Sequence, residues 1–123
     1  MSTSPNLAIP HIEPNQSQKE VTANEAFDII DRAGNGFLTL ALTGDLVLTA
    51  EQALRNATIR FTGALGSMAT VTLPGTRPRR LSVINDTGQT VRVTYPGSSV
   101  MADIPAGGRP TIHGDGADVW LLA

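Results

Sequence analysis

Few residues in this chain have the types and spacing that chemistry needs, and Asp86-Thr87-Gly88 is the most suggestive group. Homodimeric aspartic proteases carry such a loop, in which two carboxylates meet across a two-fold axis and share one proton. Those loops have apolar residues before the aspartate and a small residue after the glycine, whereas Asn85 and Gln89 stand here. A hairpin turn at Asn85–Gly88 explains the same residues, so we expect no protease.

The remaining polar residues give little support for a metal site or for a catalytic triad. His11 and His113 are the only histidines and form no ligand-spaced pair. Asp115 and Asp118 flank a tight turn but lack the other acidic ligands of a calcium loop, so we interpret them as turn formers, with weak calcium binding as the alternative. There is no cysteine and no Gly-x-Ser-x-Gly elbow. We expect a non-enzymatic protein with no catalytic, cofactor-binding or metal-binding residue and no cofactor.

Charge and hydropathy exclude two further classes of partner. The formal net charge is −2 and the isoelectric point about 5.5, which disfavours binding to nucleic acid. Arg77, Arg79 and Arg80 cluster around Pro78, and we interpret them as a solvated turn or a subunit salt bridge rather than a phosphate-binding patch. The longest apolar stretch, residues 37–42, is too short to span a membrane, and the first residues lead us to expect no secretion signal.

One segment has helical periodicity. Thr22 and Glu25 form a candidate capping box, so the helix is expected to begin at Ala23, and Gly34 is expected to end it in the left-handed conformation. Its apolar stripe consists of Ala23, Ala26, Phe27, Ile30 and Ala33. A helix this short needs a packing partner to be stable in water.

From Gly36 onward the apolar period changes from 3.6 to 2, which is typical of strands. Turn residues separate short alternating runs, one helical turn fits Glu51–Arg55, and no clear internal repeat is visible. We predict a mainly β fold: a small antiparallel β-sandwich or barrel over residues 36–123, preceded by an arm and helix over residues 1–35. The expected inward residues are Leu38, Leu40, Leu42, Leu46, Leu48, Ile59, Phe61, Val71, Leu73, Leu81, Val83, Val91, Val93, Tyr95, Val100, Ala102, Ile104, Val119 and Leu121.

The first residues contain three prolines with apolar residues between them. Pro5, Pro10 and Pro14 block helix and favour extended backbone, so the segment is either a loose terminus or an extended arm that docks on another chain. We expect the attachment and oligomer interface to use Leu7, Ile9, Ile12, Val21, Phe27 and Ile30.

Several large apolar residues break the strand alternation. They are Phe37, Val47, Met68, Ile84, Met101 and Trp120. Either the core uses both faces of some strands, or a patch is buried between protomers, and we favour the second interpretation. Ile84, Met101 and Trp120 are the candidate exposed-face contacts.

The run Asn15-Gln-Ser-Gln-Lys-Glu-Val-Thr-Ala-Asn-Glu-Ala26 resembles the opening segment of a group of bacteriophage and prophage virion proteins of the tail-fibre or tail-associated type. Three later stretches resemble the small β-modules of such particles more loosely, namely Phe61–Pro74, Asn85–Gln89 and Ile104–Val119. The resemblance implies a virion structural protein, assembled in the bacterial cytoplasm and forming a homotrimeric fibre or spike. Its implied partners are other copies of itself and other virion proteins of head or tail.

Two alternatives within the particle stay open. The chain could decorate the capsid as a cement protein. It could also bind host surface glycan through loops 85–90 and 113–118, with Tyr95 and Trp120 as the aromatic residues available to stack on a sugar ring.

Overall fold

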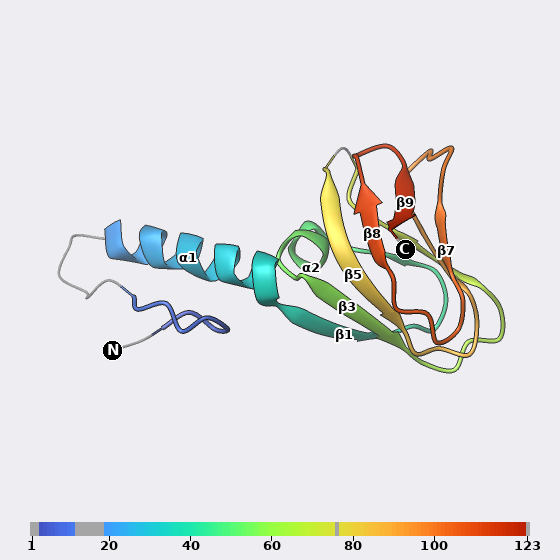
Figure 1. Cartoon of the computed structure of the whole chain (residues 1–123), viewed down its shortest axis with the longest axis horizontal. Coiled ribbons are helices and arrows are strands. Elements are labelled where there is room, and N and C mark those ends of the chain that lie inside the picture. The colour runs from blue at the N-terminus through green and yellow to red at the C-terminus, as the bar shows by residue number, and fades with distance from the viewer. Residues whose placement is uncertain (1–2, 12–18, 76, 123) are drawn as a thin grey trace.

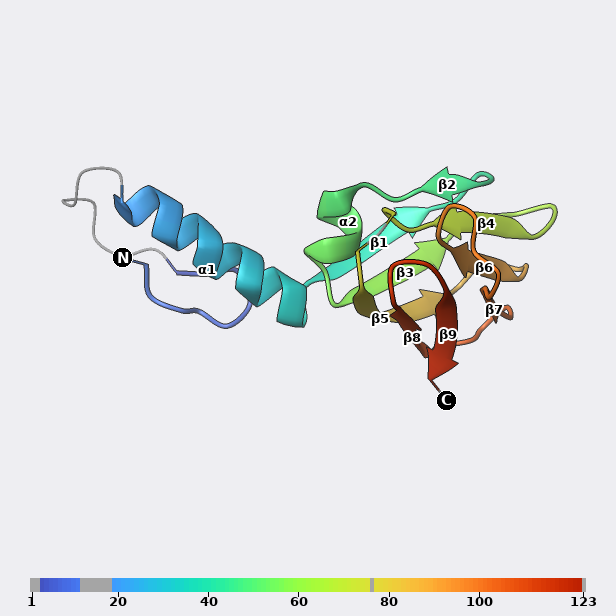
Figure 2. The ribbon, with the colours of Figure 1, turned by 90° about the horizontal axis from the view of Figure 1, so that it is seen from above.

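The computed structural model describes residues 3–11, 19–75 and 77–122. A long helix, α1 (Lys19–Asn35), stands out from a β body, and residues 3–11 run alongside this helix (Figure 1). The view from above shows the same separation between helix and body (Figure 2). The chain passes from one part to the other at Gly36.

The β body consists of two sheets packed face to face. One sheet has the order β1-β3-β5-β8-β9 and the other the order β2-β4-β6-β7. The prediction of a mainly β fold, a small sandwich or barrel, is thereby confirmed, and the body is a sandwich and not a closed barrel. The strands of the first sheet are β1 (Phe37–Ala41), β3 (Thr58–Thr62), β5 (Arg79–Asn85), β8 (Thr111–Gly114) and β9 (Val119–Leu122). Those of the second are β2 (Leu46–Val47), β4 (Ala69–Thr72), β6 (Val91–Thr94) and β7 (Ala102–Ile104).

The prediction that the strands are antiparallel was wrong for the first six. β1, β3 and β5 are parallel to one another, as are β2, β4 and β6. The chain alternates between the sheets and so winds as a coil of roughly 21 to 25 residues per turn, in which Phe37 lies beside Thr58 and Thr58 beside Ser82. Among the described strands, the antiparallel pairs are β5 with β8, β8 with β9, and β6 with β7. The alternation of apolar residues predicts which side chains are buried, but it contains no information on whether neighbouring strands are parallel or antiparallel.

Stacked apolar side chains from successive coils fill the space between the sheets. In the first sheet Leu38 lies beside Ile59, and Ile59 beside Val83. In the second, Val71 lies beside Val93. Most predicted inward residues are buried, although Val100 and Leu121 are exposed and Leu38, Leu40 and Leu46 are only partly buried. Strand β8, whose Ile112 is fully buried, was not predicted from the sequence.

The coil makes visible a repeat that the sequence analysis did not find. Val71-Thr72-Leu73-Pro74-Gly75 and Val93-Thr94-Tyr95-Pro96-Gly97 occupy equivalent places in neighbouring coils. The Leu73 N–H donates to the Thr94 carbonyl, so hydrogen bonding continues past the ends of β4 and β6. Leu73 and Tyr95 are both buried. Two similar stretches of five residues are too short to be recognised as a sequence repeat. The pairing register of β4 and β6 shows that they are equivalent.

The predicted ends of the helix were wrong. α1 begins at Lys19, so Thr22 and Glu25 lie inside it, exposed, and form no capping box at its start. The helix ends at Asn35, and Gly34 does not have a positive φ. A Thr-x-x-Glu pair also suits the interior of a helix, so the local pattern misplaced the boundary.

A capping box does form at the second helix, α2 (Ala50–Leu54), which was predicted as one helical turn. The Thr49 hydroxyl accepts the Gln52 N–H at 3.1 Å, and the Gln52 side chain accepts the Thr49 N–H at 3.0 Å. α2 lies between β2 and β3 and buries Ala53 completely.

The described part of the arm is a tight hairpin, not an extended strand. Thr3 pairs with Pro10, and the Ser4 N–H donates to the Ile9 carbonyl. Ala8 has a φ of 54°, and this left-handed residue reverses the chain. Pro10 can occupy this position because its pairing with Thr3, at the edge of the hairpin, does not require a backbone N–H from the proline. Ile12 and Pro14 lie outside the described residues.

Candidate functional site

The hairpin of residues 3–11 is held against α1 by a buried carboxylate. Asp31 is fully buried, and its Oδ2 accepts the backbone N–H groups of Asn6 and Leu7 at 2.9 and 2.8 Å. Burial by itself would raise the pKa of Asp31, but the N–H groups of Leu7 and Asn6 stabilise the charged form and lower the pKa to about 2. Asp31 is therefore ionised at neutral pH and joins the arm to the helix.

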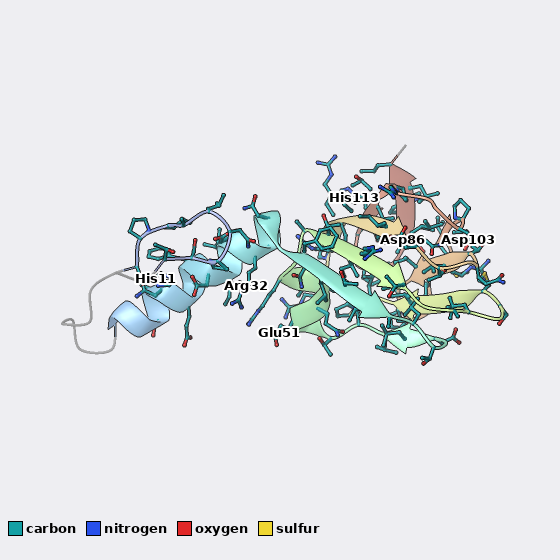
Figure 3. The ribbon with its side chains drawn as sticks, turned by 90° about the horizontal axis from the view of Figure 1, so that it is seen from below. His11, Arg32, Glu51, Asp86, Asp103 and His113 are labelled. Atoms are coloured by element: carbon teal, nitrogen blue, oxygen red, sulfur yellow. The ribbon has the colours of Figure 1, made fainter. Side chains whose placement is uncertain are left out.

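A second polar contact fixes the far end of the same hairpin. His11 Nε2 lies 2.7 Å from Asp28 Oδ1, one helical turn before Asp31. His113 belongs to β8, in the β body, so the two histidines lie in different parts of the molecule (Figure 3). Among the described residues no three His, Cys, Asp or Glu side chains gather as a metal site would require.

Another side of α1 remains exposed. Ile30 has 67% of its surface exposed, Ala26 is also exposed, and both lie on a different side of the helix from Asp28 and Asp31. Leu7, at the turn of the hairpin, is 56% exposed. The helix and hairpin thus form one unit with apolar surface still open.

The predicted interface residues are placed as follows. Leu7 and Ile30 are exposed, while Ile9 and Phe27 are half-buried. Ile12 lies outside the described residues, as does the side chain of Val21. The structure brings the described members of this set together on the helix and its hairpin, away from the β body (Figure 1).

Arg79, at the start of β5, connects α1 to the body. Its Nε donates to the Ala53 carbonyl at the end of α2, and its Nη2 donates to the carbonyls of Ala33 and Asn56. Partial burial lowers the pKa of Arg79 from its usual value. The three arginines singled out in the sequence do not form a patch, since Arg79 turns inward while Arg77 and Arg80 are exposed.

Gly36 makes the same junction tight. A Cβ at this position would lie 2.6 Å from the Arg32 carbonyl oxygen and 2.9 Å from the Asn56 side-chain oxygen. The Gly36 carbonyl accepts the N–H groups of Ala57 and Thr58. Only a residue without a side chain allows α1 to approach the first coil this closely.

A hollow of about 410 Å³ lies beside the junction, between the end of α1 and strands β5 and β8. Arg79 is already bonded to three carbonyls, so Arg80, Ser82 and Thr111 supply its remaining polar groups. One guanidinium and two hydroxyls include neither a general base nor an activated nucleophile. We assign no chemistry to this hollow.

The Asp-Thr-Gly segment serves the fold. Asp86 pairs with Arg60, with Nε and Oδ2 2.5 Å apart. Asn85 is fully buried: its amide donates to the carbonyls of Gln89, Ile104 and Pro105, and its oxygen accepts from Thr87. The expected hairpin turn was wrong, because this corner carries the chain from the first sheet to the second.

Loop 113–118 is a hairpin between β8 and β9, and its carboxylates hold it together. Asp115 Oδ1 accepts the N–H groups of Ala117 and Asp118, and Asp118 Oδ1 accepts those of Ser99 and Val100. Hydrogen bonds from Asp118 and Ala117 lower the pKa of Asp115. These contacts agree with the interpretation of both residues as turn formers.

The two aromatic residues considered for glycan binding differ in how exposed they are. Tyr95 is buried, and its hydroxyl donates to the Arg77 carbonyl. Trp120 is 42% exposed and lies beside His113 on β8. Of the other candidate contacts, Met101 is 41% exposed and Ile84 is half-buried. Of these two aromatic residues, only Trp120 is open to stack on a sugar ring.

The structural roles of three residues were not predicted from the sequence. Asp31, Arg79 and Asn85 each join segments far apart in the chain, and each resembles an ordinary surface residue in its local sequence. The only indication in the sequence was that Arg79 and Asn85 lie at the two ends of an apolar strand. No signal distinguished Asp31 from the neighbouring Asp28.

Comparison of the chain with protein-family models, with curated proteins and with solved structures gave no match. Within the described residues, no helix combines the length and hydropathy needed to cross a membrane.

Proposed function

We propose that this protein is a non-enzymatic structural component of a bacteriophage virion, a homotrimer that attaches through its arm and helix and projects its β body as part of a fibre or spike. The observation that carries the proposal is the exposed apolar side of α1, where Ile30 is 67% exposed on a helix that stands clear of its own body. The sequence resemblance over residues 15–26 points to the same role.

Physical chemistry favours a partner for this helix. An apolar side chain such as isoleucine gains about 1.5–3 kcal/mol when it is fully buried, so an exposed apolar side is costly unless another surface covers it. The hairpin of residues 3–11 covers only the side that carries Asp28 and Asp31. Packing helices of several copies against one another would bury Ala26 and Ile30 together.

The polar groups of the molecule support a structural role. Asp86 is paired with Arg60, the Asp115 and Asp118 carboxylates bind backbone N–H groups, and Asn85 is engaged within its own loop. These four side chains, which suggested chemistry in the sequence, thus have structural partners. This distribution favours a scaffold over an enzyme and over a calcium-dependent module.

Light scattering of the purified full chain tests the oligomer. We expect the mass of a trimer at micromolar concentration, and we expect Ile30→Glu to lower it because a carboxylate would be buried in the seam. Glu25→Gln is the matched control, since Glu25 is exposed on a different side of α1. A wild-type monomer at this concentration would contradict the proposal.

Immunogold labelling of purified particles tests the location. We expect label at a fixed place on intact virions, and its position on tail or capsid separates a fibre component from a decoration protein. Particles that carry no label, and no peptide of this chain by mass spectrometry, would refute a virion role.

A further inference from the structure

The first coil of the β body is open. β1 is the last strand of its sheet and β2 the last of the other, so within the described residues no strand pairs with their outer edges. Leu38, Leu40 and Leu46 point into the core from these strands and are only partly buried. Phe37 and Val47, on the same two strands, are 58% and 69% exposed. Coiled folds normally cover such an end with a polar cap.

The backbone at this end is also unsatisfied. The Leu42 N–H donates to Thr62, and the Gly36 carbonyl accepts from Ala57 and Thr58, so these alternate residues face β3. Because successive residues of a strand direct their N–H and C=O groups to opposite sides, those of Thr39 face the open edge. β1 therefore presents donors and acceptors to any strand that approaches it.

The opposite end of the body has a similar surface. β9 and β7 are the last strands there. Leu121 pairs with the fully buried Ile112 and so belongs to the inner face, yet it is 46% exposed. The Val119 N–H, two residues earlier, donates to the Val100 carbonyl, so the segment before β7 covers only the start of β9. Trp120, Val100 and Met101 at this end are 42%, 38% and 41% exposed. Both ends of the sandwich thus leave part of the core open.

We propose that copies of this chain contact one another head to tail, with the β1/β2 end of one copy against the β7/β9 end of the next. The two ends terminate the same pair of sheets, so one layer of each copy can meet the corresponding layer of its neighbour. β9 runs parallel to β5, and β5 to β1, so β9 of one copy and β1 of a copy in the same orientation would form a parallel pair that extends this mixed sheet. The contact would bury the apolar residues of both ends and pair the free edge of β1. On β9 the Val119 N–H already donates to the Val100 carbonyl, so the pairing would use the edge of β9 beyond Val119.

A contact between two different ends is heterologous, and a closed number of copies follows from the rotation between neighbours. This inference rests on the proposed trimer, in which the ring closes at three copies and α1 of each copy lies on one side of it. An open filament is the outcome if the rotation does not close.

Cysteine cross-linking of the full chain tests the contact, because the natural sequence contains no cysteine. The double variant Thr39→Cys/Trp120→Cys places one thiol at each end on exposed side chains. With a short bis-maleimide we expect covalent dimers and trimers, and no larger species, on a denaturing gel. Each single variant should give only background, since two β1 ends do not meet in a head-to-tail contact.

Thr39→Cys/Arg109→Cys is the control, because Arg109 is exposed in the loop between β7 and β8. We expect roughly tenfold less cross-linking from it, since thiols held together by an interface reach millimolar effective concentration. Circular dichroism and melting temperature check that each variant is folded. If Trp120→Cys unfolds, Met101→Cys replaces it at the same end.

The outcomes separate this inference from the proposed function. A trimer by light scattering with no cross-links above the control would overturn the head-to-tail contact and leave the trimer intact. Efficient cross-linking of either single variant would show a two-fold contact between like ends and would also overturn it. A monomer would refute both proposals. A ladder that stops at trimers, in a protein that no particle contains, would support the contact and refute the virion role.

Discussion

Arg79 donates a hydrogen bond to the carbonyl of Ala33, which lies 46 residues earlier, at the end of α1. The same guanidinium binds the carbonyls of Ala53 and Asn56, so one side chain holds the projecting helix, α2 and the first coil together. Helix ends leave carbonyls without partners inside the helix, and Arg79 satisfies one in each of two helices. The direction in which α1 leaves the body depends on this contact.

Arg79→Met should destabilise the protein by roughly 1–3 kcal/mol, because carbonyls that are shielded from water lose their donor while the volume is largely kept. Urea unfolding followed by circular dichroism measures the change. Arg80→Met is the matched control on the exposed neighbour and should fall within about 0.5 kcal/mol of wild type. Equal effects of the two substitutions would contradict the assigned role of Arg79.

Gly36→Ala should destabilise the junction by roughly 1–3 kcal/mol, because the new Cβ would meet the backbone oxygen of Arg32. Gly34→Ala is an informative partner, since its Cβ would meet nothing within 4 Å and its φ is not positive. That change should stabilise α1 by roughly 0.5–1 kcal/mol through its helix propensity. The midpoints of thermal unfolding should therefore move in opposite directions.

The hairpin should leave α1 at low pH. The pKa of Asp31 is about 2 in the folded protein and 3.8 ordinarily, so its contribution is complete above about pH 4 and is lost as the pH falls toward 2. Hydrogen exchange of the Asn6 and Leu7 amides measures the docking. In Asp31→Asn, protection should not change between pH 4 and 2, and the same loss of protection in this variant would rule out Asp31 as the titrating group.

Asn85→Ala should cost roughly 2–3 kcal/mol, because a buried amide that serves three carbonyls and Thr87 is removed. Asp86→Ala, one residue away, breaks only a partly exposed pair with Arg60 and should cost about 1 kcal/mol or less. Urea unfolding of both variants checks the contrast. A larger loss from Asp86→Ala would mean that the exposed pair, and not the buried amide, holds this corner.

The sequence by itself determined most of the apolar side chains that are buried in the β body, because their burial follows from local alternation. Ile59, Phe61, Val83 and Val91 were all identified in this way. It also indicated a helix before Gly36 and a helical turn before β3, since periodicity and composition are local properties.

Only the tertiary structure decided how the strands connect. Asn85-Asp86-Thr87-Gly88 suits a hairpin by its local conformation, but the partners of Asn85 lie at Ile104 and Pro105 and direct the chain into the other sheet. Long-range contacts determine the strand directions, the coil and the contacts made by Asp31 and Arg79. A short stretch of sequence does not predict them, because the interacting residues are distant in the chain. The free outer edge of β1 likewise became visible only when the order of the strands in the sheet was known.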